Sequence, residues 1–464
     1  MRQDPVPGLL IRSTELLDQQ FAALPAAGPA FESAADPGAM ARILEGVARR
    51  LGDNYPYFHP LYAGQMLKPP HPVARAAYAL AMTINPNNHA RDGGRASSEM
   101  EIEAVSEIAG IFGWTEFLGH LTSSGTLANL EALWVAGQLA PGKRIVGSEQ
   151  AHYTHQRISA VLKLDYAPVA ADHRGRMSMD ALETELRKGD VGTVVVTLGS
   201  TAIGAVDSLD EVLVLRSRYG FRVHVDGAYG GYFRLILDEL AEPARRANEA
   251  ISKADSIVID PHKHGLQPYG CGCILFRDPS VGRFYKHDSP YTYFTSKQLH
   301  LGEISLECSR AGASAVALWA TQQLLPLVPG GEFARGLAHS RAAALNLDRK
   351  LRQDRTGRFQ PLAAGAPELD IVVWKLKAEN PEQSSDLAQK VFDACASRDL
   401  HLALVQLPLN WFEPSAGSEP ESHATKGVEM VTCLRSVLMK PEHEAWLDRI
   451  WERLTASCEE VMGE

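Results

Sequence analysis

Helix-forming stretches and short runs of β-formers alternate along the chain from about Ser97 onward, and this alternation limits the folds open to it. The apolar spacing predicts a helix over Met100–Phe112 and another directly after the sequence TSSG. Strands are predicted at RIVGS, VGTVVVTLGS, FRVHVDGAY and SIVID. Such alternation is typical of a mainly parallel sheet covered by helices on both faces, so we expect an α/β fold.

The 464 residues are expected to divide into three parts. Residues 1–95 mix amphipathic helix with loops rich in proline and aromatic residues. Residues 96–330 hold the alternating pattern, which ends at the glycine pair in LVPGGEF. Residues 331–464 contain strands at LDIVVWKL and VEMVTCLRSVLM and a closing helix from about Glu442, which predicts a smaller α+β domain.

Charge and hydropathy exclude several classes of function. The net charge of -10 argues against nucleic acid or an anionic membrane as the main partner. The opening sequence MRQDPVPGLLIRSTELL lacks the apolar core of a secretory signal, and polar residues interrupt the most apolar helical stretch, 311–328. We therefore expect a cytoplasmic protein. The six cysteines form no disulfide framework, and no set of His and Cys residues has the spacing of a metal site.

Lys263 stands in a short loop between two predicted strands, Ser256–Ile259 and Cys273–Phe276. Pro261 ends the first strand, and further glycines and prolines keep the loop irregular. A solvated lysine needs no such setting. A lysine that is held and partly desolvated is suited to act as a nucleophilic amine.

Three other features lie at similar junctions. Ser124, Gly125 and Thr126 precede a clean helical pattern, so they can bind a phosphate or can simply cap the helix. Asp226 ends an apolar strand, at the position that faces the ligand crevice of open α/β sheets, although an Asp there can also cap a turn. His152 follows a third strand, where a structural role is the commoner one.

Taken together, these features fit pyridoxal phosphate. The helix start would bind the phosphate, Asp226 would keep the pyridine nitrogen protonated, and Lys263 would form a Schiff base. The loop around Lys263 is thus interpreted as a device that presents an amine to this cofactor.

The chain resembles the group II pyridoxal-phosphate-dependent amino acid decarboxylases of fold type I. The resemblance runs from about Tyr55 to Met439 and rests on an ordered set of motifs. These are YPYFHP, SSEMEIEAV, TSSGTLANL, SEQAHYTH, TLGSTAIGAVD, HVDGAYGG, DPHKHG and ECSRAGASAVALW. The short loop and DPHKHGLQP resemble archaeal and bacterial tyrosine/aspartate decarboxylase-like members more than animal-type members.

The resemblance implies roles for individual residues. Lys263 matches the Schiff-base lysine, His262 a phosphate contact and Asp226 the partner of the pyridine nitrogen. His152 and Ala228 match the groups on the two faces of the cofactor ring. The remaining matches are Ser200 beside the cofactor, Ser124, Gly125 and Thr126 at the phosphate, and Tyr57 and Phe58 in the substrate pocket. The resemblance also implies a homodimer, with the N-terminal segment wrapping the partner.

Two departures from the family pattern stand out. Asp260 replaces an asparagine that many relatives carry before Pro-His-Lys, and an acid close to a phosphate is unfavourable. No tyrosine falls between Phe294 and Arg310, where animal-type members place a catalytic tyrosine in a longer loop. Tyr293 is the better of the two upstream candidates for the proton donor, ahead of Tyr291, with His152 or a water as the alternatives.

The expected reaction is the decarboxylation of an L-amino acid to its amine and CO2. Three alternatives remain: a carbon–carbon lyase acting on a phosphorylated amine, decarboxylation coupled to oxidative deamination, and a scaffold that has lost its cofactor. Tyr57 and Phe58 suit an aromatic substrate, whereas Arg91, Arg95 and Arg310 suit an acidic one.

Overall fold

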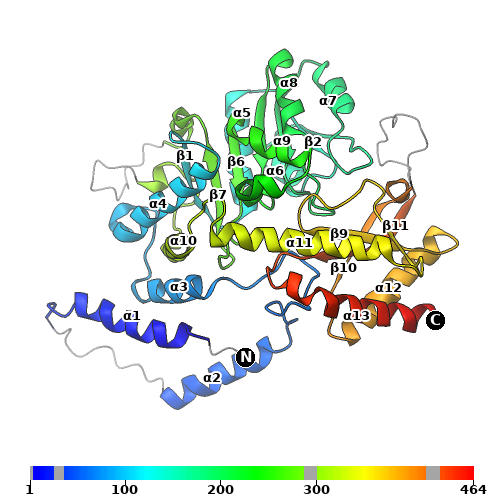
Figure 1. Cartoon of the computed structure of the whole chain (residues 1–464). Coiled ribbons are helices and arrows are strands. Elements are labelled where there is room, and N and C mark those ends of the chain that lie inside the picture. Colours follow the sequence, from blue (N-terminus) through cyan, green and yellow to red (C-terminus); the bar gives the residue numbers. More distant parts are fainter. Residues whose placement is uncertain (1–3, 26–35, 287–299, 414–428, 464) are drawn as a thin grey trace.

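A seven-stranded sheet forms the centre of the larger part of the molecule (Figure 1). The computed structural model describes residues 4–25, 36–286, 300–413 and 429–463. The strand order is β1-β7-β6-β5-β4-β2-β3, and β7 runs antiparallel to both of its neighbours while the other pairs are parallel. The expected mainly parallel α/β fold is confirmed. The strands are β1 (Leu118–Thr122), β2 (Arg144–Ser148), β3 (Tyr166–Val169), β4 (Val191–Thr197), β5 (Arg222–Asp226), β6 (Ser256–Ile259) and β7 (Gly272–Phe276).

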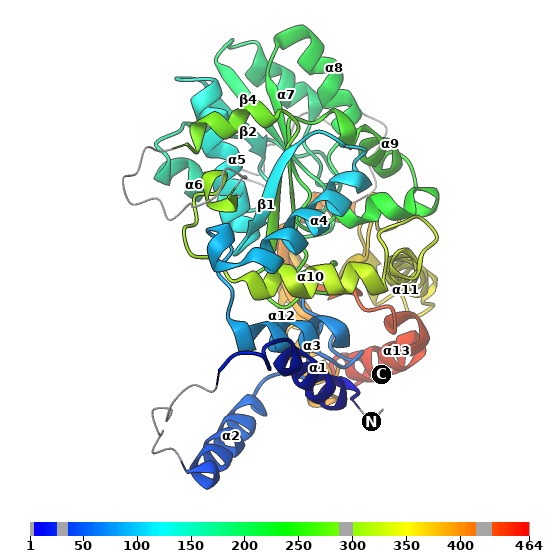
Figure 2. The same cartoon turned by 90° about the vertical axis from the view of Figure 1, so that its left-hand side faces the viewer.

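Helices cover both faces of this sheet, as the view from its edge shows (Figure 2). The central strands are nearly continuous runs of buried β-branched residues, for example Val194–Val196 in β4, as expected for strands buried on both faces. The helices are α4 (Arg95–Ile111), α5 (Gly125–Leu139), α6 (Thr154–Val161), α7 (Met179–Leu186), α8 (Leu209–Tyr219), α9 (Ala244–Glu249) and α10 (Gly312–Leu324).

A four-stranded antiparallel sheet of order β10-β11-β9-β8 forms the C-terminal part. Its two faces bury alternate residues, because side chains alternate along a strand. Ile371 and Val373 join the core of the large sheet, whereas Val372 and Trp374 pack in a second core with α12 and α13. The elements are α11 (Glu332–Gln353), β8 (Phe359–Pro361), β9 (Ile371–Leu376), α12 (Pro381–Ser397), β10 (Ala403–Pro408), β11 (Met430–Val437) and α13 (His443–Met462).

The N-terminal segment contains α1 (Val6–Gln20), α2 (Pro37–Leu51) and α3 (Pro72–Ile84). Helix α3 packs against α10, and α1 packs against α3. Helix α2 projects away from the rest of the chain in both ribbon views (Figures 1 and 2). Within the described ranges, no helix is both long and apolar enough to cross a membrane.

Candidate active site

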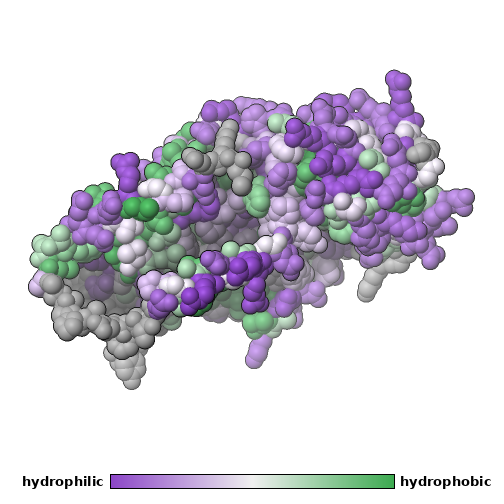
Figure 3. All heavy atoms as spheres, turned by 90° about the horizontal axis from the view of Figure 1, so that it is seen from below, coloured by the Kyte–Doolittle hydropathy of each residue, from purple (hydrophilic) through white to green (hydrophobic). Residues whose placement is uncertain are grey.

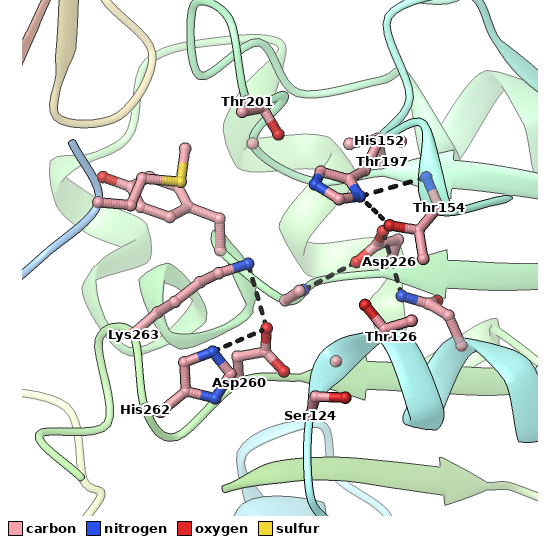
Figure 4. A pocket seen from close by; sticks show the side chains of 16 residues that line it. Ser124, Thr126, His152, Thr154, Thr197, Thr201, Asp226, Asp260, His262 and Lys263 are labelled. Atoms are coloured by element: carbon pink, nitrogen blue, oxygen red, sulfur yellow. Dashed lines mark hydrogen bonds and ion pairs between the residues drawn. The ribbon is translucent and has the colours of Figure 1, made fainter. Parts of the chain in front are cut away.

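The predicted site residues come together at one edge of the large sheet. Strands β1, β2, β4, β5 and β6 run parallel to one another, so their carboxyl ends meet at the same edge. The loops that follow these strands line one cavity (Figure 4). Its lining includes Ser124, Gly125, Thr126, Asn129, His152, Thr154, Thr197, Thr201, Asp226, Ala228, Asp260, His262 and Lys263.

The start of α5 forms the part of the cavity that suits a phosphate. Ser124 is the N-cap, and its Oγ accepts a hydrogen bond from the Leu127 amide at 3.2 Å. The first amides of a helix have no intrahelical acceptor and attract an anion. Thr126 adds a hydroxyl that lines the cavity. We call the surface formed by Ser124, Gly125 and Thr126 the phosphate cradle.

Asp226 lies at the end of β5, buried, and is held by donors on more than one side. Its Oδ2 lies 2.8 Å from Nε2 of His155, and its Oδ1 accepts the Ala228 amide at 3.1 Å. Burial acts to raise the pKa of Asp226, but the hydrogen bond from His155 and the nearby cationic groups hold that pKa below its ordinary value. Asp226 is therefore an ionised carboxylate inside the cavity.

His155 contacts a predicted site residue, Asp226, and was not predicted from the sequence. It lies in α6, three residues after His152, and is fully buried behind Asp226. Asn129 approaches the same carboxylate, with Nδ2 at 3.5 Å from Oδ2, and its Oδ1 lies 2.8 Å from Nε2 of His224. Burial lowers the pKa of His224 to about 3, so this ring is neutral and adds no charge to the network.

His152 also lines the cavity, from the loop after β2, and is half-buried. Its Nδ1 contacts the hydroxyl of Thr154 and accepts the Thr154 amide at 3.3 Å. Burial is the main reason that the pKa of His152 lies below its ordinary value. The ring is therefore neutral near pH 7, with its proton on Nε2.

Lys263 points into the cavity from the loop after β6 (Figure 4). Its Nζ lies 3.1 Å from Oδ2 of Asp260. His262 donates from Nδ1 to the carbonyl of Cys271 at 2.7 Å, which leaves Nε2 on the cavity side, 3.6 Å from the same Asp260 oxygen. Loop and strand thus hold the amine and the imidazole beside one buried carboxylate.

Comparisons with known proteins agree with this arrangement. The family described as the pyridoxal-dependent decarboxylase conserved domain matches residues 53–376. The chain belongs to this family. The decarboxylase is 27% identical to an L-tyrosine decarboxylase from Enterococcus faecium, across 87% of this chain and 85% of the relative. It is 28% identical to a probable L-tyrosine/L-aspartate decarboxylase from Methanothermobacter thermautotrophicus, across 71% and 86%.

Solved structures share the fold of the decarboxylase. Mouse CSAD superposes with a TM-score of 0.76 over 97% of both chains, at 20% identity. The Oryza sativa TDC structure with PLP and tryptamine superposes with a TM-score of 0.75 over 100% of this chain and 99% of that one, at 17% identity. The expected fold type and the pyridoxal-phosphate-dependent amino acid decarboxylase activity are confirmed.

The residues of the cavity fit pyridoxal phosphate in most respects. The cradle offers helix amides and hydroxyls for a phosphate, ionised Asp226 suits a protonated ring nitrogen, and Lys263 supplies an amine. Asp260 is the exception, since it brings a buried carboxylate to the cradle. An added Cβ at Gly125 would collide with both of its oxygens.

Other predicted site residues lie elsewhere. The hydroxyl of Ser200 accepts the Ala205 amide at 3.1 Å within its own loop, and Thr201 lines the cavity in its place. Tyr57 packs edge-to-face on Tyr62, with ring centroids 4.9 Å apart. Phe58 lines a different cavity, together with Lys68 and Lys440. Tyr291 and Tyr293 lie outside the described residues.

The three arginines that could bind an acidic substrate either pair with a glutamate or are exposed to solvent. Arg310 is buried and donates to Oε1 of Glu101 at 2.7 Å and to the carbonyl of Leu121 at 2.6 Å. Arg91 pairs with Glu99, and Arg95 is exposed at the start of α4. Arg310 therefore ties α4 to β1 and does not line the cavity around Lys263.

Proposed function

We propose that the decarboxylase removes the α-carboxylate of an L-amino acid with an aromatic side chain, with Lys263, Asp226 and His152 as its catalytic residues. The arrangement of Lys263 and Asp226 carries the proposal. An amine and an ionised, buried carboxylate face one cavity, beside a helix start that suits a phosphate. Bound pyridoxal phosphate supplies an electron sink for the electrons released when a bond at Cα breaks.

Each residue of the chain has a distinct task in this proposal. Lys263 would hold the cofactor through its amine. Asp226 would keep the ring nitrogen protonated, a role that matters most as negative charge develops during bond breaking. His155 holds Asp226 in its ionised form through the 2.8 Å hydrogen bond.

His152 and Ala228 line the cavity and are proposed to bracket the ring of the cofactor. The phosphate is proposed to lie on Ser124, Gly125 and Thr126, with His262 nearby. Proton delivery to Cα is proposed for Tyr293, with His152 or a water as the alternative. If Tyr293 is the donor, Tyr293→Phe should still release CO2, but O2 dissolved in the assay should then act as oxidant and divert product from amine to aldehyde and ammonia. Unchanged amine yield would exclude it.

The aromatic substrate class is supported by charge. The described residues that line the cavity around Lys263 include no arginine, and Arg310 is committed to Glu101. A carboxylate on the substrate side chain would therefore lack an arginine partner among these residues. The named relatives act on tyrosine, or on tyrosine or aspartate. We propose that tyrosine-like substrates are preferred to aspartate.

A panel of L-amino acids scored by CO2 release and by product tests this proposal. The expected result is fastest turnover with an aromatic amino acid and equal amounts of CO2 and amine. Fastest turnover with aspartate or glutamate would contradict the substrate class. An aldehyde without CO2, formed from a phosphorylated amine, would instead support the carbon–carbon lyase, and an aldehyde with CO2 would support oxidative deamination.

We also propose a homodimer in which residues 1–95 wrap the partner subunit. Support comes from α2, which buries no residue and exposes an apolar face. Seen from below, apolar side chains gather in patches between polar ones (Figure 3). The apolar residues of α2 recur at helical spacing, at Met40, Ile43, Leu44, Val47 and Leu51.

Oligomeric state in solution tests this part of the proposal. Ile43→Glu with Leu44→Glu should convert the dimer to a monomer in sedimentation experiments, whereas Arg42→Glu on the same helix should not. A double variant that stays dimeric would show that α2 does not form the interface. We further propose that residues 96–330 form the cofactor-binding domain and residues 331–464 the small C-terminal domain.

A further inference from the structure

Asp260 is a buried carboxylate placed against the phosphate cradle. It follows β6 directly and is 2% exposed. A Cβ added at Gly125 would lie within 2.5 Å of both oxygens of Asp260, so no side chain fits at that position without a shift. Among the described residues, none donates a hydrogen bond to its Oδ1, although the atom is buried. A buried carboxylate oxygen without a donor is costly, so its position calls for an explanation.

The charge partner of Asp260 is the amine that the cofactor uses. Oδ2 lies 3.1 Å from Nζ of Lys263 and 3.6 Å from Nε2 of His262 (Figure 4). To hold the cofactor, the amine of Lys263 would lose a proton and bond to the cofactor aldehyde, with release of water. It would then no longer be the free ammonium that pairs with Asp260.

We propose that Asp260 acts as a resident anion of the phosphate cradle, which stabilises the cofactor-free enzyme and weakens its hold on pyridoxal phosphate. This inference rests on the proposed function of the site. Asp260 takes the position of an anion at the start of α5 and pairs with Lys263 while the cofactor is absent. Cofactor binding then replaces this ion pair with a phosphate beside the carboxylate.

Both consequences of the carboxylate act in the same direction. In the cofactor-free enzyme, the pair with Lys263 stabilises the chain, so its loss on cofactor binding opposes binding. In the loaded enzyme, the phosphate would lie beside the buried carboxylate, and two anions at short range repel each other. Removing the charge of Asp260 should therefore strengthen cofactor binding through both effects.

Equilibrium titration of the full-length, cofactor-free enzyme tests the proposal. Asp260→Asn keeps the size of the side chain and removes its charge. We expect its dissociation constant for pyridoxal phosphate to fall about tenfold. The dissociation constant of the same variant for pyridoxal, which lacks the phosphate, should fall by a smaller factor. Asp238→Asn is the matched control, because it removes the same charge from an exposed residue of the segment Gly231–Glu239 and should change neither constant.

Lys263→Ala separates the two effects. In that background the ion pair is absent, so the gain from Asp260→Asn should shrink to the part caused by the phosphate. Thermal unfolding gives a second readout, since the rise in melting temperature caused by pyridoxal phosphate should be larger in Asp260→Asn than in the wild type. Asp260→Ser serves the same purpose if the Asn variant does not fold.

The outcomes distinguish this inference from the proposed function. A wild-type protein that forms no visible Schiff-base absorbance with pyridoxal phosphate would overturn the function itself. If the wild type bound pyridoxal phosphate and the folded Asp260 variants bound it equally well or more weakly, only the role of Asp260 would be overturned. If Asp260→Asn strengthened the binding of pyridoxal and pyridoxal phosphate equally, the effect would come from the pair with Lys263 alone. The phosphate cradle would then play no part in it.

Discussion

His155 and Asp226 form a buried pair, in which Nε2 lies 2.8 Å from Oδ2. The histidine comes from α6 and the carboxylate from the end of β5, so the pair joins two segments 71 residues apart in the chain. A buried carboxylate without such a donor tends to take up a proton. The pair therefore preserves the charge on which the chemistry at Asp226 depends.

Removal of this donor should lower activity without unfolding the protein. His155→Phe leaves Asp226 with weaker support, so the pKa of Asp226 should rise and kcat should fall about tenfold. The absorbance of the bound cofactor should shift as well, which a purely structural role would not cause. His155→Gln, which keeps a donor, should recover part of the activity. His339→Gln, on the exposed face of α11, should leave kcat unchanged.

Asp226→Asn tests the carboxylate itself. The amide keeps the volume of the side chain, so the fold and some cofactor binding should survive. Decarboxylation should fall about a hundredfold or more, because the ring nitrogen is no longer held protonated. CO2 release measured under saturating cofactor checks this. Near-normal turnover would show that Asp226 has only a structural role at the end of β5.

The covalent link to the cofactor can be located chemically. Borohydride reduction followed by peptide mapping should place the pyridoxyl group on Lys263, because its amine points into the cavity. Lys263→Ala should abolish turnover. A label on Lys253 or Lys286 would contradict the assignment of the site.

Arg310 should prove structural. Arg310→Met leaves Glu101 buried without its partner, which should lower the free energy of unfolding by about 3 kcal/mol. Adding Glu101→Gln should recover much of this loss, since the uncompensated charge is removed. Denaturant unfolding of the single and double variants measures both values. Altered preference between acidic and aromatic substrates would contradict the structural role.

Asp370 makes stability depend on pH. It is fully buried and accepts the hydroxyl of Tyr229 at 2.6 Å. Burial raises its pKa from 3.8 to about 6, against the hydrogen bond from Tyr229 and the charge of Lys68. The stability that Asp370 contributes is thus fully present below about pH 4 and is lost as the pH rises through 6.

Asp370→Asn does not titrate, so it removes this dependence. Its unfolding free energy relative to the wild type should rise by about 2 kcal/mol between pH 4 and pH 7. Urea unfolding at several pH values measures the change. The exposed Asp238→Asn should show no such trend. If the difference in unfolding free energy between Asp370→Asn and the wild type did not change with pH, the raised pKa of Asp370 would be contradicted.

The sequence predicted those parts of the site that depend on local structure. Asp226 ends a strand, Lys263 and the start of α5 each follow one, and parallel strands bring their carboxyl ends to one edge. This reasoning needs no knowledge of side-chain packing. It also placed strand β2 at its observed bounds, Arg144–Ser148.

Residues positioned by tertiary packing were harder to predict. His155 shows no local signal that separates it from His152, because only the fold places it behind Asp226. Ser200 and Thr201 are adjacent, and the conformation of the loop alone decides that Thr201 lines the cavity. The position of Phe58 depends likewise on a distant segment, since it shares a cavity with Lys440.

The antiparallel sheet contributes one face to the core of the large sheet, and this has a consequence for unfolding. Ile371, Val373 and Val431 are buried in the same apolar cluster as Val194 and Val225 from β4 and β5. Exposing either sheet to water would strip contacts from the other. The two lobes should therefore melt together, in one cooperative calorimetric transition, even though they differ in architecture.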